Sequence, residues 1–228
     1  MPPANPAWVA SSPPSPERTP RAEPIMAELS GGKHFSMIRS FHLADLFTIA
    51  NGVCGATAIF QAMKYLAGGD DRHLLFASVL VLVALVFDVC DGWIARWRHS
   101  ASAMGRELDS LADVISFGVA PAAIAYAAGV NAWLDQVILL FFTACGISRL
   151  ARFNVTAESL AGAKGKVTHF EGTPIPTSVV PLAMLMLAFY GGSLFPIHLG
   201  GVTVHAIALV FLLSGCLMIS KTLRIPKP

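Results

Sequence analysis

Four aspartates and one arginine lie close together in an otherwise strongly apolar stretch of the sequence. Asp88 and Asp91 have i, i+3 spacing, Asp109 and Asp113 have i, i+4 spacing, and Arg96 lies between the two pairs. On a helix, either spacing places both side chains on one face. Four carboxylates gathered in a low-dielectric site repel one another unless cations neutralise them, and oxygen ligands favour hard divalent ions such as Mg²⁺ or Mn²⁺. The pattern therefore predicts a metal site formed by two helix ends.

Three neighbouring residues indicate the reaction that such a site performs. Arg96 supplies a permanent positive charge suited to phosphate, and Gly92 and Gly105 leave the backbone open to a bulky group. Paired metals beside a phosphate-binding arginine are typical of phosphoryl-type transfer. A proton or cation pathway is the alternative, since intramembrane aspartates also serve that role. The spacing of four acids with an arginine between them favours the metal-dependent site.

The composition defines the elements that must position these residues. Of the 228 residues, 54% are hydrophobic and 13% charged, with a mean hydropathy of +0.62, whereas a soluble domain has about 25% charged residues. The net charge of +2 is too small to indicate a nucleic-acid partner. We expect an all-α polytopic membrane protein with six transmembrane helices, since apolar runs of about 20 residues span a bilayer. These helices are predicted at 43–63, 74–95, 108–130, 133–153, 174–191 and 202–220.

The distribution of basic residues predicts the orientation in the membrane. Residues 1–33 are rich in Pro and Ser and are predicted to form a disordered tail, followed by a short amphipathic interfacial helix over 34–42. With six spans, fourteen Lys and Arg residues fall on the side of the two termini, against Lys64 and Arg72 on the other. The positive-inside rule then places both termini and the acidic residues on the cytoplasmic side of the endoplasmic reticulum or a bacterial inner membrane.

The string D-x2-D-G-x2-A-R-x8-G-x3-D-x3-D, from Asp88 to Asp113, resembles the signature of the CDP-alcohol phosphatidyltransferase family at every specified position. The resemblance covers residues 34–228 as one membrane domain. Within the family, the chain is most similar to members that use serine as the acceptor, and residues 218–228 are most like those of fungi. The resemblance implies a homodimeric enzyme in membrane lipid that transfers the phosphatidyl group of CDP-diacylglycerol to the hydroxyl of L-serine and releases CMP.

The resemblance also implies roles for individual residues. Asp88, Asp91 and Asp109 would hold one divalent cation, Mg²⁺ or Mn²⁺, while Asp88, Asp109 and Asp113 would hold a second. Asp113 would also take the proton from the acceptor hydroxyl. This chain has Ala44-Asp45 where the family often has Pro-Asn. The contacts to the CDP-lipid fall on Gly92, Arg96, Ser102, Gly105, Thr48 and Asp45.

A second group of basic residues is the candidate for acceptor binding. Arg149 and Arg152 are spaced to grip the serine carboxylate, with Asn154 or Glu171 near its ammonium group. Alternatively, both arginines are positive-inside anchors, or Arg149 binds a lipid phosphate. Inositol phosphate or glycerol 3-phosphate as the acceptor would require more basic residues. An ion-coupled transporter or a lipid-binding scaffold are the alternatives outside the family.

Overall fold

The computed structural model describes residues 43–98, 103–162, 169–171, 173–199, 201–220 and 224–226. The predicted tail and interfacial helix lie outside these residues. Four helical stretches of the described chain are long and apolar enough to cross a membrane, at Asp45–Gly68, Asp71–Ile94, Met104–Ala127 and Trp133–Thr156. These stretches correspond to the first four predicted spans. The last two correspond to shorter apolar helices, Ile175–Tyr190 and Ala206–Ile219, so the count of six stays a prediction.

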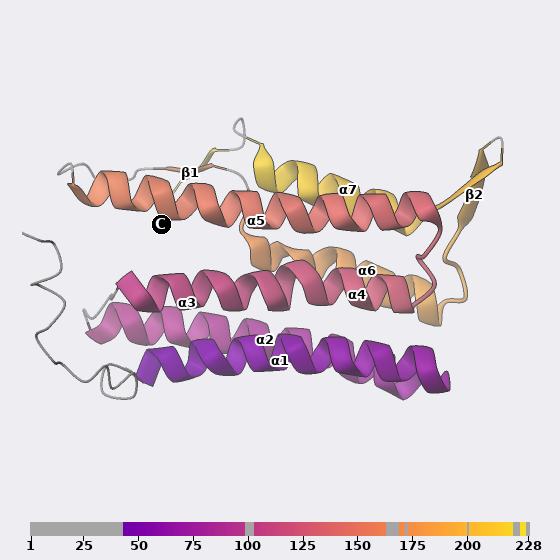
Figure 1. Ribbon diagram of the computed structural model, residues 1–228, viewed down its shortest axis with the longest axis horizontal. Helices are drawn as coiled ribbons and strands as arrows, with labels where there is room; N and C mark the ends of the chain where they lie inside the picture. Colours follow the sequence, from indigo (N-terminus) through magenta and orange to yellow (C-terminus); the bar gives the residue numbers. More distant parts are fainter. Residues whose placement is uncertain are drawn as a thin grey trace, which may run out of the picture. The chain divides into compact units, whose positions relative to one another are not determined.

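Helices α1 (Leu43–Gly68) and α2 (Asp71–Arg98) form a tight antiparallel hairpin (Figure 1). The turn between them needs a left-handed residue, which Gly69 supplies with φ of 69°, and its N–H donates to the Tyr65 carbonyl at 2.7 Å. Glycine adopts this conformation without the steric cost of a Cβ. Because the helices run in opposite directions, the first turns of α1 lie beside the last turns of α2.

The third predicted span is one continuous helical path with an irregular middle (Figure 1). It consists of α3 (Ala103–Asp113), the π-helix η3 (Val114–Val119) and α4 (Ala120–Ala127). Pro121, near the start of α4, lacks an N–H and would clash with the carbonyl four residues earlier in a regular helix. A shift to wider π turns before the proline accommodates both defects. The π-helix begins directly after Asp113, and such segments are frequent at functional sites.

Helix α5 (Trp133–Gly162) returns along this path and packs against α7 (Ala206–Ile219). The contact is close because a Cβ on Gly215 would lie 3.2 Å from the Phe142 Cα atom. The rings of Phe142 and Phe211 pack edge to face at a centroid distance of 5.3 Å, nearly perpendicular to each other. These buried aromatic side chains belong to the apolar core that holds α5 and α7 together.

A short 3-10 helix, η4 (Ile175–Ser178), leads into α6 (Val179–Tyr190), which contacts both α2 and α7. Ile175 is fully buried and lies against Gly146 of α5, where a Cβ would be 2.8 Å from the Ile175 Cδ1 atom. The absence of a side chain at Gly146 therefore lets the segment that starts α6 pack onto α5.

Two small antiparallel strand pairs depart from the all-α prediction. Strand β1 (His169–Glu171) pairs with β4 (Arg224–Pro226), and β2 (Pro196–Leu199) pairs with β3 (Val202–His205). The predicted span at 202–220 therefore begins too early, because α7 starts only at Ala206. The hairpin reverses at Gly201, whose φ of 94° favours glycine. The Val-Thr-Val run before α7 is extended and pairs with β2, which supplies partners for its backbone hydrogen bonds.

Candidate metal centre

Three carboxylates from two helices converge at one site. Asp88 and Asp91 of α2 and Asp109 of α3 each offer an oxygen, and these atoms all lie within 4.8 Å of one another. We call these three residues the acidic cluster. Asp91 is buried, and the other two are half-buried. The Asp109 Oδ1 atom is buried without a hydrogen-bond partner in the described part of the chain. A buried carboxylate oxygen without a donor, next to two further carboxylates, fits a divalent cation with oxygen ligands.

Asp113 lies beside the acidic cluster but is not one of its three members. It is buried one turn after Asp109, and its Oδ1 atom accepts a hydrogen bond from Asn51 Nδ2 at 3.2 Å. Its carboxylate is within electrostatic range of the three cluster members. The structure thus brings all four predicted aspartates into one region. Asp113 differs from the three cluster members in its hydrogen bond from Asn51.

Helix α1 supplies the polar groups that orient two of these carboxylates. Thr48 Oγ1 donates to Asp91 Oδ2 at 2.7 Å, and Asn51 donates to Asp113. Asp45 is also buried, one turn before Thr48. The three α1 residues recur every third position in the otherwise apolar first half of α1, so they share one helix face. This polar periodicity could have revealed Asn51, which the sequence analysis missed.

A close approach of α1 to the third helical path brings these donors within reach. A Cβ on Gly55 would lie 2.6 Å from the Ser116 Cα atom, and one on Gly52 would lie 3.4 Å from the Ala112 Cβ atom. Ser116 Oγ, in the π-helix, donates to the Asn51 carbonyl oxygen at 2.9 Å. Asn51 is therefore fixed through its backbone to η3 while its side chain contacts Asp113.

The candidate acceptor residues of α5 differ in their surroundings. Arg149 is half-buried and within electrostatic range of Asp113, its guanidinium carbon lies 5.8 Å from the centre of the Phe153 ring, and its Nε atom lacks a hydrogen-bond partner in the described part of the chain. Arg152 is exposed. Asn154 Nδ2 donates to Ser110 Oγ at 3.0 Å and to Glu107 Oε2 at 3.3 Å. Asn154 thus ties α5 to α3, the helix that carries Asp109.

The other predicted site residues fall into two groups. Gly92 is half-buried directly after Asp91, and Gly105 is half-buried in the first turns of α3. Arg96 belongs to α2 and Glu171 to β1, but their side chains, like Ser102, lie outside the part of the chain that the structure describes.

Comparisons with known proteins identify the family to which this arrangement belongs. The model of the CDP-alcohol phosphatidyltransferase family matches residues 41–215, a range that includes the acidic cluster and Asp113. The chain belongs to this family. It is 42% identical over 223 residues to the CDP-diacylglycerol–serine O-phosphatidyltransferase of Saccharomyces cerevisiae, covering 94% of this chain and 81% of the yeast protein.

Two prokaryotic proteins are similar to a shorter part of this chain. The archaetidylserine synthase of Methanothermobacter thermautotrophicus is 39% identical over 152 residues, which cover 65% of this chain and 59% of that protein. The CDP-diacylglycerol–serine O-phosphatidyltransferase of Bacillus subtilis is 32% identical over 151 residues, covering 65% of this chain and 77% of that protein. Two of the three names denote a serine O-phosphatidyltransferase, and the third denotes the synthesis of archaetidylserine.

Proposed function

We propose that this chain transfers the phosphatidyl group of CDP-diacylglycerol to the hydroxyl of L-serine and releases CMP. The observation that carries the proposal is the convergence of three carboxylates from α2 and α3 beside Asp113, in a chain of this family. The similarity to the yeast serine O-phosphatidyltransferase over 94% of this chain supports serine as the acceptor.

The donor atoms of the acidic cluster support a divalent-metal cofactor, Mg²⁺ or Mn²⁺. Asp88, Asp91 and Asp109 would hold one ion, and Asp88, Asp109 and Asp113 a second, as the family resemblance implies. When bound, divalent cations neutralise charge on the pyrophosphate of the donor and on the departing CMP.

The chain's own residues supply the proton transfer. A serine hydroxyl is a weak nucleophile at its free pKa, so a base must accept its proton as the new bond between serine oxygen and the β-phosphorus forms. Asp113 takes that proton, and the bond from the β-phosphorus to the oxygen that leaves with CMP breaks. The Asn51 amide holds the Asp113 carboxylate in place, and Thr48 does the same for Asp91. The base acts through its position, since the Asn51 hydrogen bond fixes one carboxylate oxygen.

Arg149 is better placed than Arg152 to receive the serine carboxylate. Its half-buried guanidinium group is in range of Asp113 and has an unused Nε donor, whereas Arg152 is exposed. A carboxylate acceptor bound there brings its hydroxyl close to the base. Asn154 has a positioning role in this proposal, because its amide is already bonded to α3.

The test is a CMP-release assay with purified full-length protein, CDP-diacylglycerol, Mg²⁺ or Mn²⁺ and one acceptor at a time. Serine should give CMP and a serine phospholipid in equal amounts, and chelation of the metal should abolish both. Arg149→Lys should raise the KM for serine more than that for CDP-diacylglycerol, with Arg152→Lys as the matched control. Product with inositol phosphate or glycerol 3-phosphate, and none with serine, would overturn the acceptor assignment.

The same preparation distinguishes the enzyme from the classes outside the family. A cation or proton transporter would show ion-coupled flux in vesicles without CMP release. A lipid-binding scaffold would keep its lipid affinity in Asp113→Asn and never form product.

The wider architecture is part of the proposal. Six spans would place fourteen of the sixteen Lys and Arg residues on the side of the two termini and the acidic cluster, and the positive-inside rule makes that side cytoplasmic. Cysteine labelling from either side of sealed vesicles tests the orientation. The homodimer implied by the family resemblance is tested by the mass of the detergent-solubilised protein.

A further inference from the structure

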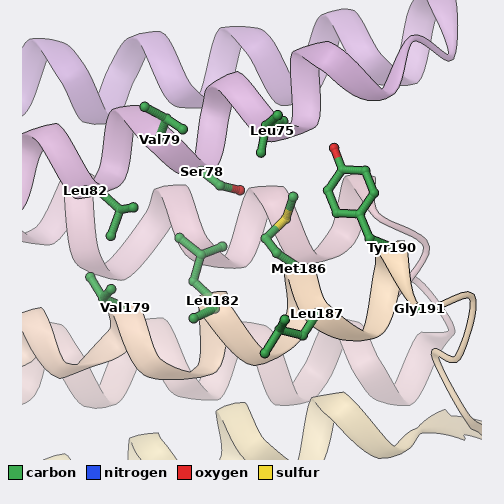
Figure 2. Close-up of a pocket in the computed structure, with 11 residues that line it drawn as sticks. Leu75, Ser78, Val79, Leu82, Val179, Leu182, Met186, Leu187, Tyr190 and Gly191 are labelled. Atoms are coloured by element: carbon green, nitrogen blue, oxygen red, sulfur yellow. The ribbon is translucent and has the colours of Figure 1, made fainter.

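An apolar groove runs between α2 and α6, toward the end of α2 that lies away from the acidic cluster. It has a volume of about 650 Å³, and Figure 2 shows Leu75 and Leu82 of α2 facing Met186 and Leu182 of α6. Ser78 Oγ, on the same wall, donates to the Leu74 carbonyl oxygen at 3.0 Å, so it needs no partner from a ligand. The groove therefore offers hydrocarbon contacts alone over most of its length.

A second hollow adjoins this groove at the α1–α2 turn. It has a volume of about 540 Å³ and shares Leu75 and Val79 with the apolar groove. Its remaining lining includes Lys64 and Gln61 of α1 and Arg72 and His73 of α2. The His73 Nδ1 and Gln61 Oε1 atoms lie 2.8 Å apart, which holds these two side chains together. We call this hollow the basic pocket.

The charge of the basic pocket is unusual for its position in the chain. Lys64 and Arg72 are the only Lys or Arg residues between Asp45 and Asp88, and segments 107–148 and 173–220 contain none. Both side chains are exposed, and no ion pair joins either of them to an acidic residue of the described chain. Asp70 and Asp71 are nearby but do not line the pocket, and Asp70 Oδ1 accepts the Arg72 backbone N–H at 3.0 Å.

Two cations beside an apolar wall, at the end of a membrane-spanning helix, are complementary to a phospholipid. The cations suit its phosphate, and the apolar wall suits its acyl chain. Lys and Arg keep their charged groups at the interface and attract phosphate, while their aliphatic stems cover apolar surface. The acyl chain of a lipid held there would lie along the shared wall of Leu75 and Val79 into the groove. The charge and the shape of the two hollows thus favour one occupant.

We propose that the basic pocket and the apolar groove together bind a glycerophospholipid, with its phosphate at Lys64 and Arg72 and one acyl chain between α2 and α6. Asp88 follows Arg72 by sixteen positions on α2, or about 24 Å along the helix axis at 1.5 Å per residue. The site is therefore distinct from the one where the donor lipid reacts, and the proposal does not depend on which acceptor the enzyme uses.

The test uses full-length protein in phosphatidylcholine nanodiscs that contain a minor fraction of phosphatidylglycerol with a photoreactive diazirine at the end of one acyl chain. Irradiation followed by peptide mass spectrometry should place the label on residues 75–82 and 182–187. The double variant Lys64→Gln/Arg72→Gln should lose most of that label, while Lys64→Arg/Arg72→Lys should keep it. Ala183→Trp, which fills the groove, should also lose it, with Leu213→Trp on the exposed face of α7 as the matched control.

Two further arms separate this site from other lipid contacts. Diacylglycerol with the same diazirine chain should label these residues several-fold less, because it lacks the phosphate. Excess CDP, which carries the nucleotide and pyrophosphate of the donor but no acyl chain, should leave the label in place. Equal labelling by the two probes, or undiminished labelling of the Lys64→Gln/Arg72→Gln variant, would mean that the label reports ordinary surrounding lipid, and would overturn the proposal. Displacement of the label by CDP would also overturn it, because the label would then lie in the donor site. CMP release by each variant confirms that it is folded.

Discussion

Buried carboxylates occur in two separate regions of this protein, and their environments differ. Asp135, in the first turn of α5, is fully buried and accepts hydrogen bonds from Ala132 N–H at 3.1 Å and from His205 N–H at 2.9 Å. Its Oδ2 atom also lies 2.6 Å from His205 Nδ1. In the acidic cluster, by contrast, Asp109 Oδ1 has no hydrogen-bond partner in the described chain and two further carboxylates lie beside it.

Under the proposed function, this difference would separate a structural acid, Asp135, from the acids of the reaction site. Asp135 has its partners within the chain and fixes the β2–β3 hairpin to the start of α5 through His205. If the proposal holds, the like charges of the acidic cluster and the unpartnered Asp109 Oδ1 atom lower the stability of the metal-free protein and favour cation binding. Local stability is commonly reduced at sites that bind and react. The following predictions test this contrast, from the largest expected effect to the smallest.

The largest effect is expected for Asp113→Asn. The amide cannot accept the proton of the acceptor hydroxyl, so CMP release should fall by about 10²- to 10⁴-fold, the usual contribution of a positioned base. Its thermal unfolding temperature in detergent without metal should stay the same or rise, because one like charge is removed from the site. Asp71→Asn, an exposed acid in the first turn of α2, is the control and should keep full activity. Activity above a tenth of wild type in Asp113→Asn would contradict the role of Asp113.

Asp135→Ala should show the reverse pattern. The substitution leaves the N–H groups of Ala132 and His205 without their acceptor, at about 1–3 kcal/mol for each buried group. Thermal unfolding in detergent should therefore occur at a clearly lower temperature. Activity per folded molecule should stay close to wild type. A loss of activity at full stability would mean that Asp135 belongs to the reaction and that the contrast between the two regions is wrong.

Gly55→Ala tests the packing that brings α1 to the acidic region. Its new Cβ would lie 2.6 Å from the Ser116 Cα atom, so α1 must move away from η3. Overpacking of this kind costs about 1–3 kcal/mol, and the same displacement should weaken the contact from Asn51 to Asp113. We expect losses of both stability and CMP release. Gly68→Ala is the matched control, because nothing lies within 4 Å of a Cβ there, and similar losses in both variants would argue against this packing effect.

The smallest effect is expected for Thr48→Val, which removes the 2.7 Å hydrogen bond to Asp91 while keeping the shape of the side chain. A net loss of about 1 kcal/mol corresponds to roughly a five-fold decrease in activity. The decrease should shrink as the metal concentration is raised, because the bond orients a metal-binding carboxylate. Ser78→Ala removes a hydroxyl that bonds only within its own helix and should leave activity unchanged. A metal-independent defect would place Thr48 outside the metal site.

The first four spans and the convergence of the aspartates could be read from the sequence, for physical reasons. Long apolar runs specify membrane helices, and i, i+3 or i, i+4 spacing specifies a helix face whatever the tertiary structure. The position of Asn51 beside Asp113 could not be read, because it depends on how closely α1 approaches η3. The strand pairing at 202–205 was missed because an apolar run before a helix has the same hydropathy whether it is helical or extended.

The sequence by itself determined the membrane character, the family signature and the chemical type of the site, because composition, spacing and side-chain chemistry are local properties. Only the tertiary structure decided which polar groups meet. It brought Thr48 to Asp91 and Asn154 to Ser110, it satisfied Asp135 with His205, and it left Asp109 Oδ1 without a partner in the described chain. These outcomes depend on glycine-mediated helix contacts between segments far apart in the sequence, where a shift of less than an ångström decides whether a hydrogen bond forms.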